Sequence, residues 1–151
     1  MALSHSYTVN LSWQHDRQGV LFSKELENSL PVATPPPFPK GVEKIWSPEH
    51  LFTAAVSSCF MTTFLAIAEN SKLEFESFAC KASGKLEQVD GKYKMTEVVL
   101  EPQLVISHEK DQARALRVLE KAEAACLITN SITSTVTMKP TIVIGGLVSV
   151  L

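Results

Sequence analysis

The pattern of apolar and polar residues changes several times along the chain, and each change marks an expected element. Residues 7–13 alternate and residues 20–23 form a short strand candidate, so the turn-forming residues 15–19 between them predict a β-hairpin. Residues 31–41 contain five of the eight prolines, which lock φ and remove amide donors. We expect an extended connector there, neither helix nor central strand, with a flap over a pocket as the alternative.

A long helix is predicted from Ser47 to about Ser71. Ser47 is a favoured N-cap residue, and Pro48 is favoured at the first helical position. Glu49 places an acidic side chain in the first turn. Residues 51–68 run for 18 residues without a charge, but six of them are Ser, Thr or Cys. The length is borderline for a bilayer span, which needs roughly 20 apolar residues. We therefore expect a core helix that is buried nearly all round, which a chain of this size achieves most simply as a dimer.

The second half of the chain predicts strands on both sides of another helix. Residues 73–107 have the composition of two long strands, joined by a hairpin turn at Asp90-Gly91. Residues 109–125 are rich in Ala, Leu, Glu, Lys and Arg and predict an amphipathic helix. Residues 133–144 are β-branched and predict a final strand at a sheet edge.

These elements indicate the fold class. Their order, β-β-α-β-β-α-β, is typical of an α+β domain with two helices on a mostly antiparallel sheet, one helix being fully buried. The sequence shows no repeat, low-complexity tract or composition shift that would mark a boundary. We therefore expect residues 1–151 to form a single domain.

Charge and composition narrow the functional classes. The 151 residues include 14 Lys+Arg and 16 Asp+Glu, for a net charge of −2, and only three are arginines. Proteins that bind nucleic acids present a basic face, so that partner is not expected. The first ten residues lack the basic stretch and apolar run of a secretory signal. We expect a cytoplasmic protein that is not in a membrane and whose cysteines are free unless they have a redox role.

No motif for a metal or nucleotide is visible. The four histidines include no i,i+4 pair, and the chain has neither Cys-x-x-Cys nor a glycine-rich phosphate loop. We therefore expect no metal and no other cofactor.

The cysteines remain as candidate chemistry: Cys59 in the long helix, Cys80 in a strand and Cys126 at the end of the second helix. A free cysteine is most often a small buried hydrophobe. Cys59 stands out because small hydroxyl residues flank it and because Glu49 precedes it by ten residues. A nearby cation lowers a thiol pKa, and the leading candidate is Arg17, paired with Glu49. Ten helical residues span about 15 Å, so one arginine reaches both groups only across an antiparallel dimer.

At this point a family resemblance appears. The stretch SPEHLFTAAVSSCF, residues 47–60, resembles the signature of the osmotically inducible protein C / organic hydroperoxide resistance (OsmC/Ohr-like) family. That signature is a Pro-Glu, a helix of small residues and an Ala/Ser-Cys-Phe at this same ten-residue interval. Cys126 follows a charged helix as the family's second cysteine does, although Leu127 stands where proline is usual. The resemblance covers nearly the whole chain and implies an intertwined homodimer with two long central helices wrapped by sheets.

The resemblance also implies a thiol-dependent peroxidase for organic hydroperoxides, without metal, haem or flavin. Cys59 would be the peroxidatic thiolate and become a sulfenic acid. Cys126 would resolve it as a disulfide, which an external dithiol would reduce. Arg17 and Glu49 would form an ion pair that holds the thiolate and orients the peroxide. Four apolar residues would line the substrate pocket or, as the alternative, pack in the core: Leu51, Phe52, Phe60 and Phe64.

Two other functions are compatible with the same fold. A non-catalytic dimer would bind a small apolar ligand in that pocket, with Cys59 and Cys126 inert. A thiol redox sensor would form the disulfide but would not cycle rapidly with excess dithiol. Cys80 is expected to be structural in every case.

Overall fold

The computed structural model describes residues 3–145 of the chain. The chain consists of two compact units, Met1–Leu51 and Phe52–Leu151. The boundary falls in the first turn of the long helix α1 (Pro48–Asn70). The expectation of a single domain stays a prediction.

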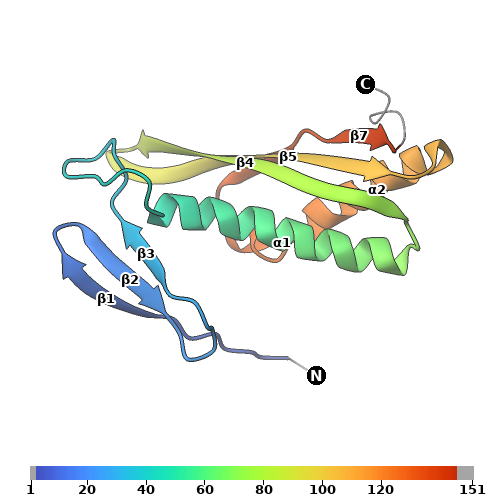
Figure 1. Cartoon of the computed structure of the whole chain (residues 1–151). Coiled ribbons are helices and arrows are strands. Elements are labelled where there is room, and N and C mark those ends of the chain that lie inside the picture. Colours follow the sequence, from blue (N-terminus) through green and yellow to red (C-terminus); the bar gives the residue numbers. More distant parts are fainter. Residues whose placement is uncertain (1–2, 146–151) are drawn as a thin grey trace. The chain divides into compact units, whose positions relative to one another are not determined.

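The first unit contains an antiparallel sheet of three strands, β1 (Asn10–His15), β2 (Gln18–Phe22) and β3 (Leu30–Ala33) (Figure 1). The hairpin of β1 and β2 confirms the prediction, with Asp16 in the left-handed region at φ 46° in its turn. Strand β3 was not predicted. It accommodates Pro31, which has no amide donor, because β3 lies at the end of the strand order.

After β3 the chain folds into turns. Phe38 N–H donates to the carbonyl of Pro35 at 3.1 Å, and Gly41 N–H donates to that of Phe38 at 3.0 Å. Val42 N–H donates back to the carbonyl of Thr34 at 2.8 Å and closes the loop. The expected extended connector is therefore wrong in this part, because proline also presets φ for turns.

Helix α1 begins as predicted. The Ser47 hydroxyl accepts the His50 N–H at 3.1 Å, and the Ser47 carbonyl accepts the Leu51 N–H at 2.9 Å. Ser47 is fully buried, and its hydroxyl also lies 2.6 Å from Nδ1 of His50. This N-cap satisfies an amide that the first turn would otherwise leave without a partner.

Helix α1 ends one residue before the predicted limit. Lys72 adopts the left-handed conformation, with φ 56°, and the N–H of Leu73 donates to the carbonyl of Ala68 at 2.9 Å. Arg114 adds a donor from the next helix, with Nη1 at 3.0 Å from the carbonyl of Ser71. This arginine is therefore part of the structure that terminates α1.

The second unit is built on a long hairpin of β4 (Phe75–Val89) and β5 (Lys92–Ile106). Asp90 and Gly91 form its two-residue turn with φ values of 52° and 79°. Positive φ at both central residues is the type I′ geometry that matches the twist of paired strands. The predicted hairpin and its turn are confirmed.

The last strand differs from the prediction. It forms two short strands, β6 (Thr135–Met138) and β7 (Thr141–Ile144), both parallel to β5. The break falls at Pro140, which has no N–H for the ladder. The pairing is parallel because helix α2 (Gln112–Ala125) forms the crossover from β5. Short 3-10 turns flank α2: η1 (Glu109–Asp111) and η2 (Thr129–Ser131).

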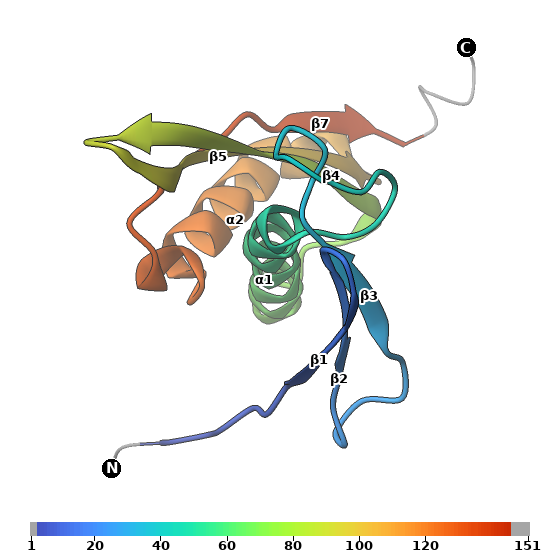
Figure 2. The same ribbon diagram turned by 90° about the vertical axis from the view of Figure 1, so that its left-hand side faces the viewer.

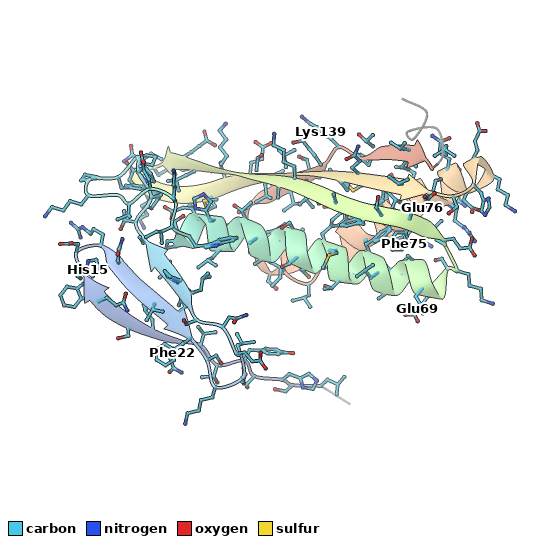
Figure 3. The ribbon with its side chains drawn as sticks, in the orientation of Figure 1. His15, Phe22, Glu69, Phe75, Glu76 and Lys139 are labelled. Carbon is cyan, nitrogen blue, oxygen red and sulfur yellow. The ribbon has the colours of Figure 1, made fainter. Side chains whose placement is uncertain are left out.

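Helices α1 and α2 lie on the same face of the sheet formed by β4 to β7 (Figures 1 and 2). The residues of α1 that are buried form one stripe with i,i+4 spacing: Val56, Phe60, Phe64 and Ala68. The ring of Phe64 lies 5.3 Å from that of Phe75 on β4, which Figure 3 labels. This stripe and the sheet form the core of the second unit.

The rest of α1 is less buried than expected. Met61 is 38% exposed and Leu65 41% exposed, so a single chain does not bury the helix all round. By length and composition alone α1 could also cross a bilayer. Its buried stripe shows instead the one-sided packing of a helix on a sheet.

The close approach of β4 to α1 at Gly84 gives a test of this packing. A Cβ at Gly84 would overlap Oγ1 of Thr53 and lie 2.8 Å from Cε of Met95. We expect Gly84→Ala to lower the free energy of unfolding in urea by about 1–3 kcal/mol, because overpacking displaces neighbouring atoms. Ser83→Ala, at an exposed neighbouring position, should change it by less than about 0.5 kcal/mol. Equal stability of Gly84→Ala and wild type would contradict the close approach.

Candidate functional site

Cys59 and Cys126 are brought together in the second unit. Cys59 is half-buried near the middle of α1, and Cys126 caps the C-terminus of α2 and is 1% exposed. The backbone of Cys126, at φ −64° and ψ 116°, turns the chain away from the helix. The thiol of Cys126 hydrogen-bonds to the sulfur of Cys59, and both cysteines are free. Two residues that are distant in the sequence thus form one thiol pair.

The surroundings of Cys59 favour its thiolate. Burial by itself raises the pKa of the Cys59 thiol, but four hydrogen bonds together lower it below its ordinary value. The donors, in decreasing order of effect, are the Ile128 amide, the Cys126 thiol, the Thr63 hydroxyl and the Leu127 amide. Hydrogen bonds to the charged form stabilise that form. Cys59 therefore carries more thiolate at a given pH than an ordinary cysteine.

The small hydroxyl residues that flank Cys59 in the sequence are not among these donors. The hydroxyls of Ser57 and Ser58 donate to helix carbonyls one turn back, at 3.2 and 3.4 Å. Thr63 has its Oγ1 at 4.0 Å from the sulfur of Cys59. Its position four residues after Cys59 on one helix face is the signal that would have found it. The two backbone amides leave no signal in the sequence.

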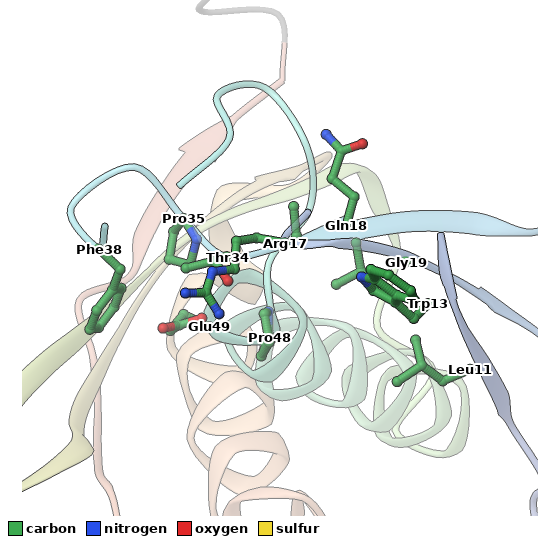
Figure 4. Close-up of a pocket in the computed structure, with 12 residues that line it drawn as sticks. Leu11, Trp13, Arg17, Gln18, Gly19, Thr34, Pro35, Phe38, Pro48 and Glu49 are labelled. Carbon is green, nitrogen blue, oxygen red and sulfur yellow. The ribbon is translucent and has the colours of Figure 1, made fainter. Parts of the chain in front are cut away.

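Arg17 and Glu49 lie in the first unit, where both line a pocket of about 430 Å³ (Figure 4). Arg17 comes from the turn between β1 and β2, and Glu49 from the first turn of α1, where the helix dipole favours a carboxylate. Figure 4 shows the guanidinium and the carboxylate turned toward the same part of the pocket. Most other wall residues are apolar, and they include Leu11, Trp13, Val32, Ala33, Pro35 and Phe38.

The proline-rich segment supplies one wall of this pocket. Pro35 and Phe38 belong to residues 31–41, for which a plain connector was the favoured prediction. The segment therefore lines a pocket, whereas the alternative prediction of a flap over a pocket stays a prediction. The hydrogen bonds that fold it into turns hold these two side chains at the pocket wall.

The four apolar residues expected near Cys59 have different environments. Phe60 and Phe64 are fully buried, and both rings pack against Phe78 on β4, at 5.8 and 4.8 Å. Core packing, the alternative for these two residues, therefore describes them, because their stripe faces the sheet. Phe52 is half-buried and lines a different pocket of about 380 Å³, beside the start of β5 and the residues that follow η2. Leu51 is half-buried at the end of the first unit.

Cys80 differs from the thiol pair. It is half-buried on β4 and packs against the core. Burial raises the pKa of its thiol, which reduces the thiolate at neutral pH. Among residues 3–145 no cluster of three or more His, Cys, Asp or Glu side chains could hold a metal ion.

Known proteins resemble the chain over almost its whole length. A family model described as OsmC-like protein matches residues 41–141. An OsmC-like protein of unknown function from Vibrio cholerae is 27% identical, with a TM-score of 0.81 over 91% of this chain and 99% of its own. An organic hydroperoxide resistance protein from Elizabethkingia anophelis is 21% identical, with a TM-score of 0.73 over 95% of this chain and 100% of its own. The uncharacterized protein YmaD of Bacillus subtilis is 24% identical over 140 residues, or 89% and 91% of the two chains.

The matched range includes Glu49, Cys59 and Cys126, whereas Arg17 precedes it. The α+β arrangement of the chain agrees with that of the solved relatives. On the extent of the family match and the shared fold, the chain belongs to the OsmC-like protein family.

Proposed function

We propose that this protein is a cytoplasmic, thiol-dependent peroxidase that reduces organic hydroperoxides. The observation that carries the proposal is the hydrogen-bonded pair of Cys59 and Cys126, in which the pKa of Cys59 is lowered. The thiolate is the nucleophilic form of cysteine, and a second thiol in contact with it is placed to react next. The organic hydroperoxide resistance protein of Elizabethkingia anophelis, which has the same fold, supports organic hydroperoxides as the substrate class.

The proposed cycle has three steps. The Cys59 thiolate attacks the terminal oxygen of the hydroperoxide, the O–O bond breaks, and the leaving alkoxide takes a proton to give an alcohol. Cys59 is then a sulfenic acid. The Cys126 thiol attacks its sulfur, forming a disulfide and releasing water. An external dithiol reduces this disulfide to two thiols and is itself oxidised to a disulfide.

We assign to Arg17 and Glu49 an ion pair that stabilises the thiolate and orients the peroxide. Their position in one pocket supports this assignment, since the planar guanidinium matches the geometry of a carboxylate. The apolar walls suit the alkyl group of the substrate. Leu51 and Phe52 remain candidates for contact with it.

We also propose that the working form is a homodimer. Each unit exposes apolar side chains: Leu11 and Trp13 on β1 are 66% and 73% exposed, and Met61 and Leu65 lie on α1. Large apolar side chains that are exposed within one chain are candidates for burial in an interface. A second antiparallel copy would bring the start of one α1 beside the middle of the other, and so Arg17 and Glu49 of one chain near Cys59 of its partner.

The first experiment compares wild type with Cys59→Ser in the consumption of an alkyl hydroperoxide and of hydrogen peroxide under excess dithiol. We expect rapid loss of the alkyl hydroperoxide with wild type, slower loss of hydrogen peroxide, and neither above background with Cys59→Ser. Cys80→Ser is the matched control and should stay within about a few-fold of wild type, since its thiol is outside the pair.

The result also separates the alternative functions. Folded, dimeric wild type that consumes no more peroxide than Cys59→Ser would overturn the peroxidase. If peroxide still linked Cys59 to Cys126 in that protein, a redox sensor would be indicated. If neither peroxide nor diamide linked them, the apolar pocket would be indicated as a ligand-binding site.

Cys126→Ser should separate oxidation from resolution. We expect this variant to reduce about one equivalent of alkyl hydroperoxide and then stop, because no second thiol forms the disulfide. Further peroxide should convert Cys59 to sulfinic acid, detected by mass spectrometry of its peptide. Sustained turnover of Cys126→Ser at the wild-type rate would remove Cys126 from the cycle.

Arg17→Ala tests the ion pair. We expect the rate of thiolate oxidation to fall by about tenfold or more, because a cation near a thiolate stabilises it. Arg117→Ala, on an exposed position of α2, is the matched control and should react at the wild-type rate. Loss of rate in Arg117→Ala but not in Arg17→Ala would transfer the role to Arg117. Arg114 is less suitable for it because its guanidinium binds the end of α1.

A further inference from the structure

We infer that Ser131 is a positioning residue for Cys59: its hydroxyl orients the turn that follows α2 so that the amides of Ile128 and Leu127 point at the Cys59 sulfur. This inference deepens the proposed function: Ser131 affects catalysis only if Cys59 is the peroxidatic thiolate. It concerns donors that lie entirely within the second unit. It therefore describes a way of holding the thiolate that does not use an arginine.

Three carbonyl groups of the turn after α2 accept hydrogen bonds. The Cys126 carbonyl accepts the N–H of Asn130 at 3.0 Å. The next carbonyl, that of Leu127, accepts the hydroxyl of Ser131 at 2.7 Å. The amide of Ser131 also donates to the carbonyl of Ile128 at 3.0 Å. Three consecutive carbonyls are thus bonded to the two residues that close the turn.

Because a peptide unit is planar, these hydrogen bonds also fix the direction of the neighbouring amides. In a planar trans peptide the N–H points away from the C=O of the same unit. The carbonyl of Cys126 shares its peptide with the Leu127 amide, and the carbonyl of Leu127 shares its peptide with the Ile128 amide. Anchoring both carbonyls on one side therefore aims both amides to the other side, where they hydrogen-bond to the sulfur of Cys59.

Fixed backbone donors suit a thiolate in a partly buried site. They carry no side-chain rotamers, so they do not lose rotamer entropy when the negative charge forms. They also act without reorganisation at the moment of reaction, as the amides of an oxyanion hole do. The Ile128 amide has the largest effect of the four donors, and it belongs to the peptide whose carbonyl Ser131 holds.

The test measures the pH dependence of Cys59 alkylation in the full reduced protein. The Cys59 thiolate displaces iodide from iodoacetamide, and the peptide that carries Cys59 is quantified by mass spectrometry. The midpoint is the pH at which the alkylation rate of Cys59 reaches half of its maximum. For Ser131→Ala we expect this midpoint to rise by about half a pH unit, which lowers the alkylation rate about threefold at a pH below both midpoints. Ser131→Thr, which keeps the hydroxyl, should restore the wild-type midpoint.

Ser134→Ala is the matched control. It removes the same group three residues further on, where the hydroxyl donates to the carbonyl of Met95 on β5 and not to the turn. We expect its alkylation midpoint to equal that of wild type. A shift as large as that of Ser131→Ala would mean that loss of any nearby hydroxyl loosens the site, and would overturn the inference.

Leu127→Pro removes one amide directly. The extended backbone of Cys126, ψ 116°, is the conformation that a residue before proline adopts, and the Leu127 side chain is 65% exposed. We expect the midpoint to rise by up to about half a pH unit, whereas Leu127→Ala, which keeps the N–H, should match wild type. Circular dichroism checks the fold, and if Leu127→Pro is unfolded then Ser131→Ala decides alone.

Folded Ser131→Ala and Leu127→Pro with wild-type midpoints would overturn the inference. Alkylation requires no peroxide, so the outcome is independent of turnover. A protein without peroxidase activity whose midpoint rises in Ser131→Ala would retain the positioning role and lose the proposed function. An active peroxidase with unchanged midpoints would retain the function and lose the role of Ser131.

Discussion

The packing of one stripe of α1 against the β4–β5 hairpin is the interaction on which the second unit depends. Phe60 and Phe64 are fully buried there, and their rings lie against Phe78. Adjacent residues of an α-helix are rotated by about 100°, so turning Phe60 into the core points Cys59 along a different direction. That direction leads to the end of α2, where Cys126 and the turn after it hydrogen-bond to the Cys59 sulfur. Hydrophobic packing thus decides which thiols meet.

The Cys59 thiol and the Arg17–Glu49 pair, which both have a proposed chemical role, differ in their electrostatic surroundings. Cys59 is surrounded by neutral donors, two of them backbone amides, which lower its pKa against the opposing effect of burial. Arg17 and Glu49 place an opposite pair of charges in a pocket with mostly apolar walls. Neutral donors favour the thiolate locally, whereas a charged pair can orient a polar peroxide group within apolar surroundings. In the proposed homodimeric peroxidase, the two groups at one site would come from two copies of the chain.

The residues alone predicted much of the local structure, and they predicted the family. A serine N-cap followed by Pro-Glu marked the start of α1, and Asp90-Gly91 marked the β4–β5 turn, because these motifs satisfy backbone geometry over a few residues. The interval from Glu49 to Cys59 and the helix before Cys126 carried the family resemblance. Position 127 was visible only as a departure from the family's pattern, with no physical meaning attached to it.

The surroundings of each of these residues depend on how distant parts of the chain pack together. The parallel pairing of β6 and β7 with β5 depends on the path of α2, and the role of the proline-rich segment as a pocket wall depends on hydrogen bonds between its turns. The burial of Phe60 and Phe64 depends on which stripe of α1 meets the sheet. The donors to Cys59 are the clearest case. Every residue except proline has an N–H, so residue identity cannot indicate which amide reaches the sulfur; that is set by the orientation of two peptide planes in the folded chain.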